Sequence, residues 1–150
     1  MLLPSLFIAE SHKGGRGVFT NKPIPADTVI EISPVLVFSI KEKPFIEQTH
    51  LANYVFEWGY SRRYRALGMG YVSMYNHDYS ANCDYEMDFE EKTIRVKTVK
   101  PIPKGGELYI NYNADPEEKK PLWFDAVWFF TDLYAKPFII LKGFVVSNPY

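Results

Sequence analysis

The sequence predicts a mainly β fold with small helices, and three observations lead to this class. Short β-branched or aromatic runs alternate with polar residues in several segments of the first 112 residues. Gly, Pro and Asn residues separate these runs at short intervals, as turns do. The 150 residues are 47% hydrophobic and 23% charged, which is the composition of one ordinary folded domain.

Charge and cysteine content exclude several classes of protein. The net charge of -1 provides no overall basic field, so direct binding of nucleic acid is not expected. Cys83 is the single cysteine, which excludes an internal disulfide and a multi-cysteine zinc site. Neither a signal peptide nor an apolar run long enough for a membrane helix is recognised. We expect a soluble intracellular protein of the cytoplasm or nucleus.

The N-terminal third predicts a meander of strands. The turn at residues 14–17 (Gly-Gly-Arg-Gly) separates the first two runs. Residues 28–32 and 35–38 are β-branched enough to form strands, and Pro34 between them is expected to break the pairing.

One helix is expected over residues 45–58. Ile46, Leu51, Tyr54 and Trp58 recur near helical spacing, and Gly59 follows as a stop.

Residues 83–112 return to alternating strands at 85–89, 93–99 and 107–112, the last of which follows a turn at residues 104–106. The first of these strands is acidic and could face a basic peptide, although a solvated outer face is the simpler interpretation; its acids are Asp84, Glu86, Asp88, Glu90 and Glu91. In the aromatic tail, residues 124–134 are expected to be helical and residues 137–146 to form a strand.

Three short motifs carry chemistry, and each alone is weak. The glycine turn at residues 14–17 is an ordinary hairpin turn or a close approach to a cofactor, but no helix follows it as in a dinucleotide site. The loop at residues 76–82 fits a polar turn. His77 in that loop has no second His or Cys at ligand spacing, so no metal is expected. The third motif is residues 105–112.

Taken together and in order, the motifs resemble the SET family of protein-lysine methyltransferases, especially its compact viral and bacterial members. The matching segments read GGRGVF, NHDYSANC and GGELYINY, and the likeness runs from about Phe7 to Trp123. The resemblance implies a SET domain (β-clip) of short antiparallel sheets with a C-terminal pseudoknot over residues 1–123. Residues 124–150 would form an extension packed on the domain or on a second subunit, which leaves a homodimer open.

The chain departs from the family pattern at three positions. Asp78 stands where the family has Ser, Ala81 where it has Pro, and Gly106 shifts one acidic residue of the closing motif. Asp78 places an additional charge near the expected cofactor site.

The resemblance implies transfer of a methyl group from S-adenosylmethionine to a lysine side chain of another protein. It assigns the catalytic roles to Tyr112, Tyr54 and Tyr85, although Tyr54 and Tyr85 also fit plain core positions. Cofactor contacts are implied for a larger set, with Trp123, or Phe124 beside it, as an aromatic cover: Gly15, Arg16, Gly17, Asn76, His77, Tyr112 and Trp123.

The substrate is expected to be a protein or peptide with an accessible lysine, and a histone is one candidate. The alternative is a catalytically silent SET-like module that binds a basic peptide. Retention of Asn76, His77, Asn82 and Tyr112 favours the enzyme, since a pure binder needs no cofactor residues.

Overall fold

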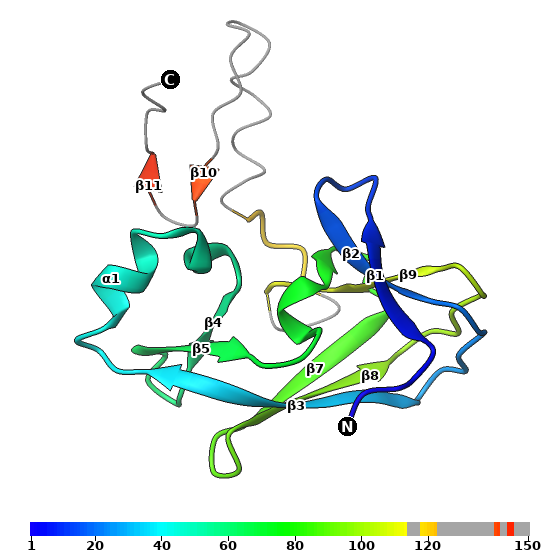
Figure 1. The fold of residues 1–150 in the computed structure, drawn as a ribbon, viewed down its shortest axis with the longest axis horizontal. Coiled ribbons are helices and arrows are strands. Elements are labelled where there is room, and N and C mark those ends of the chain that lie inside the picture. The colour runs from blue at the N-terminus through cyan, green and yellow to red at the C-terminus, as the bar shows by residue number, and fades with distance from the viewer. Residues whose placement is uncertain (114–117, 123–139, 142–143, 146–150) are drawn as a thin grey trace, which may run out of the picture.

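The computed structural model describes residues 1–113, 118–122, 140–141 and 144–145. Two main sheets make up this part, a four-stranded sheet in the order β1-β2-β9-β6 and a five-stranded sheet in the order β4-β5-β3-β8-β7 (Figure 1). The strands are β1 Leu6–Glu10, β2 Arg16–Thr20, β3 Val29–Phe38, β4 Val55–Trp58, β5 Tyr64–Gly68, β6 Asn76–His77, β7 Cys83–Asp88, β8 Thr93–Thr98 and β9 Glu107–Ile110. The expected mainly β class with small helices is therefore confirmed.

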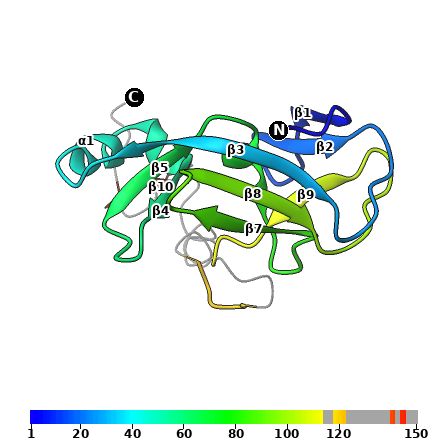
Figure 2. The same ribbon diagram turned by 90° about the horizontal axis from the view of Figure 1, so that it is seen from below.

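β3 is one continuous strand, so the expected break at Pro34 is wrong. Residues 29–34 pair with β8 and residues 35–38 pair with β5, both antiparallel. Pro34 lies where the partner changes, a position at which its missing N–H disrupts no ladder, and its carbonyl accepts a hydrogen bond from Met69 N at 3.0 Å. The long strand thus has β5 on one side and β8 on the other, and β7 lies beyond β8 (Figure 2).

The single helix expected over residues 45–58 is also wrong. A five-residue helix, α1 (Lys43–Glu47), is followed by a 3-10 turn, η1 (His50–Asn53), and then by β4. The Thr49 hydroxyl accepts a hydrogen bond from Leu51 N at 3.2 Å and starts the 3-10 turn. Residues 55–58 pair with β5 along their whole length, so the sheet prevails over the helical spacing.

The second half of the domain positions the site. The strands expected between residues 83 and 112 are present as β7, β8 and β9. β9 is antiparallel to β2 and parallel to the short β6, with Asn76 opposite Tyr109 and His77 opposite Ile110. Two segments far apart in sequence therefore lie side by side. The pseudoknot itself stays a prediction, because the chain after residue 113 is described only in part.

Side chains from both sheets form one buried cluster. Its fully buried members include Ile30, Ile94 and Val96 from the large sheet, and Val18, Leu108 and Ile110 from the small one. Of the tail, the structure describes β10 (Ile140–Leu141) and β11 (Phe144–Val145), which form an antiparallel pair within the region where a strand was expected. The helix expected at residues 124–134 lies outside the described residues. No helix in the described part is long and apolar enough to cross a membrane.

Candidate active site

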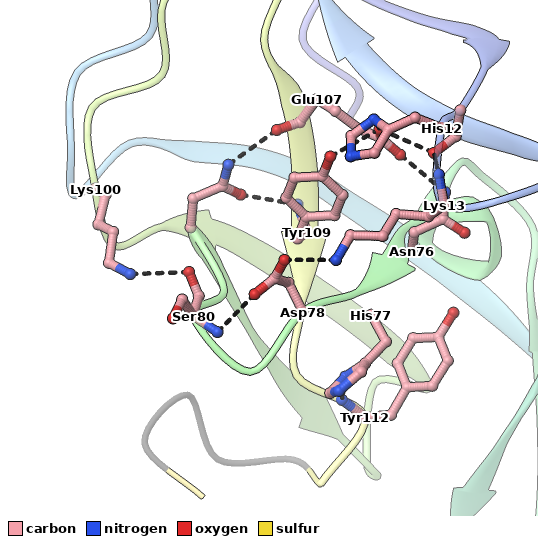
Figure 3. A network of polar contacts seen from close by, with 12 residues as sticks. His12, Lys13, Asn76, His77, Asp78, Ser80, Lys100, Glu107, Tyr109 and Tyr112 are labelled. Atoms are coloured by element: carbon pink, nitrogen blue, oxygen red, sulfur yellow. Dashed lines mark hydrogen bonds and ion pairs between the residues drawn. The ribbon is translucent and has the colours of Figure 1, made fainter. Parts of the chain in front are cut away.

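The centre of the site is the short segment that leads from the 3-10 turn η2 (Val72–Met74) through Tyr75 into β6. Tyr112, just beyond β9, bonds to it twice. Its hydroxyl donates to the Tyr75 carbonyl at 2.9 Å. Its backbone N–H donates to His77 Nδ1 at 3.2 Å (Figure 3). The closing motif therefore lies against the segment that carries the Asn-His pair.

Glu107 and Asn76 connect β2, the strand that carries Gly17, to the same centre through hydrogen bonds and close contacts. Asn76 Nδ2 donates to Glu107 Oε1 at 2.8 Å and lies 3.4 Å from the Arg16 carbonyl. The other carboxylate oxygen of Glu107 accepts hydrogen bonds from Ser11 Oγ at 2.9 Å and Tyr109 Oη at 2.8 Å (Figure 3). A Cβ at Gly17 would meet both Glu107 Oε1 and Asn76 Nδ2, so this position requires glycine.

Asn82 extends the sheet with its side chain. Its Nδ2 donates to the Glu107 carbonyl at 2.9 Å, and its Oδ1 accepts from Tyr109 N at 2.8 Å. The amide thereby satisfies two backbone groups of β9 and fixes the loop at residues 76–82 against that strand.

Asp78, the charge that departs from the family pattern, is paired. Lys13 Nζ lies 2.8 Å from Asp78 Oδ2, with 38% and 29% of the two side chains exposed. Burial raises the pKa of Asp78, but the hydrogen bonds from Lys13 and from Ser80 N outweigh it, and the pKa ends below its ordinary value. Lys13 also lies 5.4 Å from the centre of the Tyr109 ring. The ion pair links the glycine turn to the loop at residues 76–82.

Two cavities meet at this centre. The larger, about 770 Å³, lies among Phe56, Tyr85, Met87 and other side chains, and the smaller, about 310 Å³, lies beside the glycine turn. The residues that line both are Asn53, Tyr54, Ser73, Tyr75 and Tyr112. Tyr112 is thus common to the two spaces.

The residues expected from the sequence divide between these cavities. Tyr54 and Tyr112 line both, and Tyr85 lines the larger. Gly15, Arg16 and Asn76 line the smaller. Gly17 and His77 line neither cavity: Gly17 packs on Glu107, and His77 accepts the Tyr112 N–H. Trp123 lies outside the described residues.

Aromatic side chains with neutral phenols form part of the wall of the larger cavity, which charged side chains such as Glu57 and Arg62 also line. Burial, followed by the neighbouring Tyr54, raises the pKa of Tyr112 to about 12, and burial, followed by Asp84, raises that of Tyr85 to about 12. The Phe56 and Tyr85 rings meet edge to face with 5.4 Å between their centres. Both hydroxyls therefore stay protonated at neutral pH, and the walls can surround a lysine stem and attract its cation.

The acidic side chains of the β7 region do not line this cavity. Tyr85, Met87 and Phe89 of the β7 region point to it, and alternation along the strand directs the intervening acids to the opposite face. Glu86 instead lies 3.9 Å from Arg95 across the sheet. The solvated outer face is the interpretation that fits.

The cavity residues that sequence reasoning missed include Asn53, Phe56, Ser73 and Tyr75. Tyr75 was within reach, because it directly precedes the Asn-His pair. No sequence motif marks Asn53, Phe56 or Ser73, which are brought to the cavities by the fold.

Comparisons with known proteins agree with this geometry. The model of the SET domain matches residues 15–113. A histone-lysine N-methyltransferase of Schizosaccharomyces pombe, specific for H3 lysine-37, is 39% identical over 121 residues, which are 80% of this chain and 77% of that protein. A Plasmodium falciparum structure assigned as a histone methyltransferase is 26% identical, with a TM-score of 0.58, over 72% of this chain and 92% of that one.

A structure of the Chaetomium thermophilum Polycomb Repressive Complex 2, a humanized mutant bound to an inhibitor, shares the fold at 19% identity. Its TM-score is 0.61, and the match covers 73% of this chain and 15% of that chain.

The fold and the family match define a SET domain, and the chain belongs to the SET family. Within that family its activity is that of a protein-lysine N-methyltransferase.

Proposed function

We propose that S-adenosylmethionine binds in the smaller cavity and that the target lysine enters through the larger one, so that the two meet beside Tyr112. The observation that carries this proposal is the set of five residues, Tyr112 among them, that line both cavities. In-line methyl transfer needs a donor and an acceptor approaching one point from opposite directions, and two cavities with a common wall supply that arrangement.

The smaller cavity suits the cofactor in size and lining. About 310 Å³ falls at the lower end of the usual range of ~300–1,000 Å³ for small-molecule sites. Gly14 and Gly15 have positive φ values, 101° and 64°, and no atom within 4 Å of an added Cβ, so their backbone is open to a ligand. Gly15, Arg16 and Asn76 would hold the cofactor there. Its sulfonium supplies the methyl group to be transferred.

The chain's own residues would prepare the amine. A lysine side chain has an ordinary pKa near ~10.4, and enclosure by Phe56, Tyr85 and Met87 disfavours its charged form. The Tyr112 hydroxyl donates its proton to the Tyr75 carbonyl, and a phenol oxygen that donates in this way can also act as an acceptor for the amine N–H. Tyr112 would thus orient the nitrogen lone pair toward the methyl group.

Calorimetric titration with S-adenosylmethionine, followed by methyl transfer onto a lysine peptide array, tests the proposal. Binding with one site per chain and labelled lysines are expected. If the folded protein binds no cofactor, the catalytically silent peptide-binding module becomes the better account. An array also reports the sequence around the preferred lysine.

We further propose a histone as the substrate and the nucleus as the place of action. The support is the S. pombe relative, whose substrate is a lysine of histone H3. Incubation with each recombinant core histone and labelled cofactor, followed by mass spectrometry of the product, should locate methylation in one of them. If all four histones stay unlabelled while another protein in a cell extract is modified, the histone proposal is wrong.

The division into a domain at residues 1–123 and an extension at residues 124–150 is likewise a proposal. So are the cover over the cofactor by Trp123 and a homodimer formed through the extension. The support is the aromatic composition of that segment, whose exposure to water would be costly.

A further inference from the structure

Besides Glu107, a second carboxyl group, Glu31, is hydrogen-bonded to the segment that carries the site, and it lines neither cavity. Glu31 on β3 is 0% exposed and accepts three hydrogen bonds. Ser33 Oγ donates to Oε1 at 2.5 Å and Val72 N to Oε1 at 2.9 Å, while the Tyr75 hydroxyl donates to Oε2 at 3.0 Å. One donor is the first residue of η2 and another is the residue that follows its last, so Glu31 holds the turn at both ends.

The backbone next to Glu31 is shaped for this contact. A Cβ at Gly70 would meet Glu31 Oε1 and Ser33 Oγ, so only glycine lets the chain before η2 pass this close to the carboxyl group. A buried carboxyl group with three donors is satisfied, whereas removal of a donor or of the acceptor leaves a buried polar atom without its partner.

Tyr75 connects this buried contact to the reacting centre. Its side chain is bonded to Glu31 and its carbonyl accepts the Tyr112 hydroxyl at 2.9 Å. Burial, followed by the charge of Glu31, raises the pKa of Tyr75 well above its ordinary value, so its phenol remains a donor at neutral and moderately alkaline pH. The side chain of Tyr75 is thus held by a buried residue of the core, and its carbonyl is the acceptor for the Tyr112 hydroxyl.

We infer that Glu31 is a positioning residue for methyl transfer: through the Tyr75 hydroxyl it fixes the Tyr75 carbonyl and, with it, the direction of the Tyr112 hydroxyl. The inference rests on the proposed function, because it assigns the role to the transfer step at Tyr112. A shift of the carbonyl by a fraction of an ångström would turn the phenol oxygen away from the amine. Small misplacements of a reacting group are costly in rate.

The chain offers a matched pair of variants. Tyr75→Phe and Ser33→Ala each remove one hydroxyl donor to Glu31, and only Tyr75 belongs to the segment that meets Tyr112. Replacement of Glu31 itself risks the fold, because three donors would lose their acceptor together. Both single variants are expected to lower the melting temperature by similar amounts. Tyr75→Phe should also lower kcat by about tenfold, with KM for the cofactor unchanged, whereas Ser33→Ala should keep the wild-type kcat.

A second readout does not depend on activity. In protein labelled with ¹³Cζ-tyrosine, the Tyr112 resonance, assigned with Tyr112→Phe, should move in Tyr75→Phe and stay in place in Ser33→Ala. An unmoved Tyr112 resonance, or a loss of kcat that is equal in the two variants, would overturn the inference. If the wild-type protein transfers no methyl group, the proposed function fails, and the resonance still decides whether Glu31 orients Tyr112.

Discussion

Tyr112 is the residue on which the account of transfer depends. It lines both cavities, and its hydroxyl donates a hydrogen bond to the Tyr75 carbonyl at 2.9 Å. Tyr112→Phe should lower the transfer rate by about 10²-fold, the scale on which a misplaced reacting group acts. Cofactor affinity measured by calorimetry should stay near wild type, and the lost hydrogen bond should cost about 1 kcal/mol of stability.

Tyr60→Phe is the control for that variant. The Tyr60 side chain is 90% exposed and lines neither cavity, so its hydroxyl should be irrelevant to rate. Equal turnover of the Tyr112 variant and the control would remove Tyr112 from the transfer step.

The ion pair between Lys13 and Asp78 has a smaller, salt-dependent effect. It ties the glycine turn to the loop at residues 76–82, and exposed pairs of this kind contribute about 0–1 kcal/mol. Lys13→Met should therefore weaken cofactor binding by no more than about fivefold at low salt, and the difference from wild type should vanish near ~1 M salt, where charges are screened.

Lys100→Met provides the comparison, since Lys100 donates to the Ser80 carbonyl in the same loop without reaching the glycine turn. Titrations at several salt concentrations measure both variants. A Lys13 effect that is independent of salt, or matched by Lys100, would show that the pair does not hold the turn.

At the scale of single residues, the sequence led to the motif positions and not to their supports. Tyr112, Asn76 and Arg16 were found because their motifs are recognisable as text. Glu31 and Tyr75 were not, because their importance arises from a hydrogen bond between residues 44 positions apart. The paired state of Asp78 was equally hidden, since its partner Lys13 is 65 positions away.

At the scale of elements, the packing of β2 on β9 depends on Gly17. An added methyl group would collide with the Glu107 carboxylate and the Asn76 amide. Gly17→Ala should therefore destabilise the fold by about 1–3 kcal/mol, as overpacking does, and should weaken cofactor binding through Asn76. Urea unfolding followed by circular dichroism measures the first effect, and calorimetry the second.

Gly105→Asn separates this collision from a general glycine effect. Gly105 has φ of 80°, and an added Cβ there meets nothing within 4 Å. Asn accepts the left-handed region better than most residues, so the variant should cost less than Gly17→Ala. If Gly17→Ala is as stable as wild type, the close contact between β2, Glu107 and Asn76 is not tight in solution.

The elements themselves were predicted where alternation is strong and misassigned where tertiary pairing decides. β7, β8 and β9 follow visible alternation between turns. The apolar residues in 55–58 continue a helical spacing, yet the segment pairs with β5. No local sequence pattern predicts that pairing. Pro34 was expected to end a strand, but a proline fits a strand at the point where one neighbour replaces another.

At the scale of the whole molecule, buried thiol and phenol groups make the fold less stable as the pH becomes alkaline. Burial, followed by Asp84, raises the pKa of Cys83 from 9.0 to about 12, and those of Tyr85 and Tyr112 rise from 10.0 to about 12. The fold therefore holds these protons more tightly than the unfolded chain. Their contribution is fully present below about pH 9 and is lost as pH rises toward about 12.

Urea unfolding at several pH values tests this dependence. The free energy of unfolding should be level from neutral pH to about pH 9 and should then decline. In Cys83→Ala the decline should begin about one pH unit later, near pH 10, because only the tyrosines remain to titrate. A free energy that stays level to pH 11 in the wild type would contradict the raised pKa values.

A structure of the protein with S-adenosylhomocysteine and a lysine peptide bound together tests the central claim most directly. We expect the nucleoside product in the cavity beside Gly15, Arg16 and Asn76, and the lysine in the cavity beside Phe56 and Tyr85. The sulfur and the lysine nitrogen should approach each other next to the Tyr112 hydroxyl. Both ligands in one cavity, or a lysine that ends away from Tyr112, would contradict it.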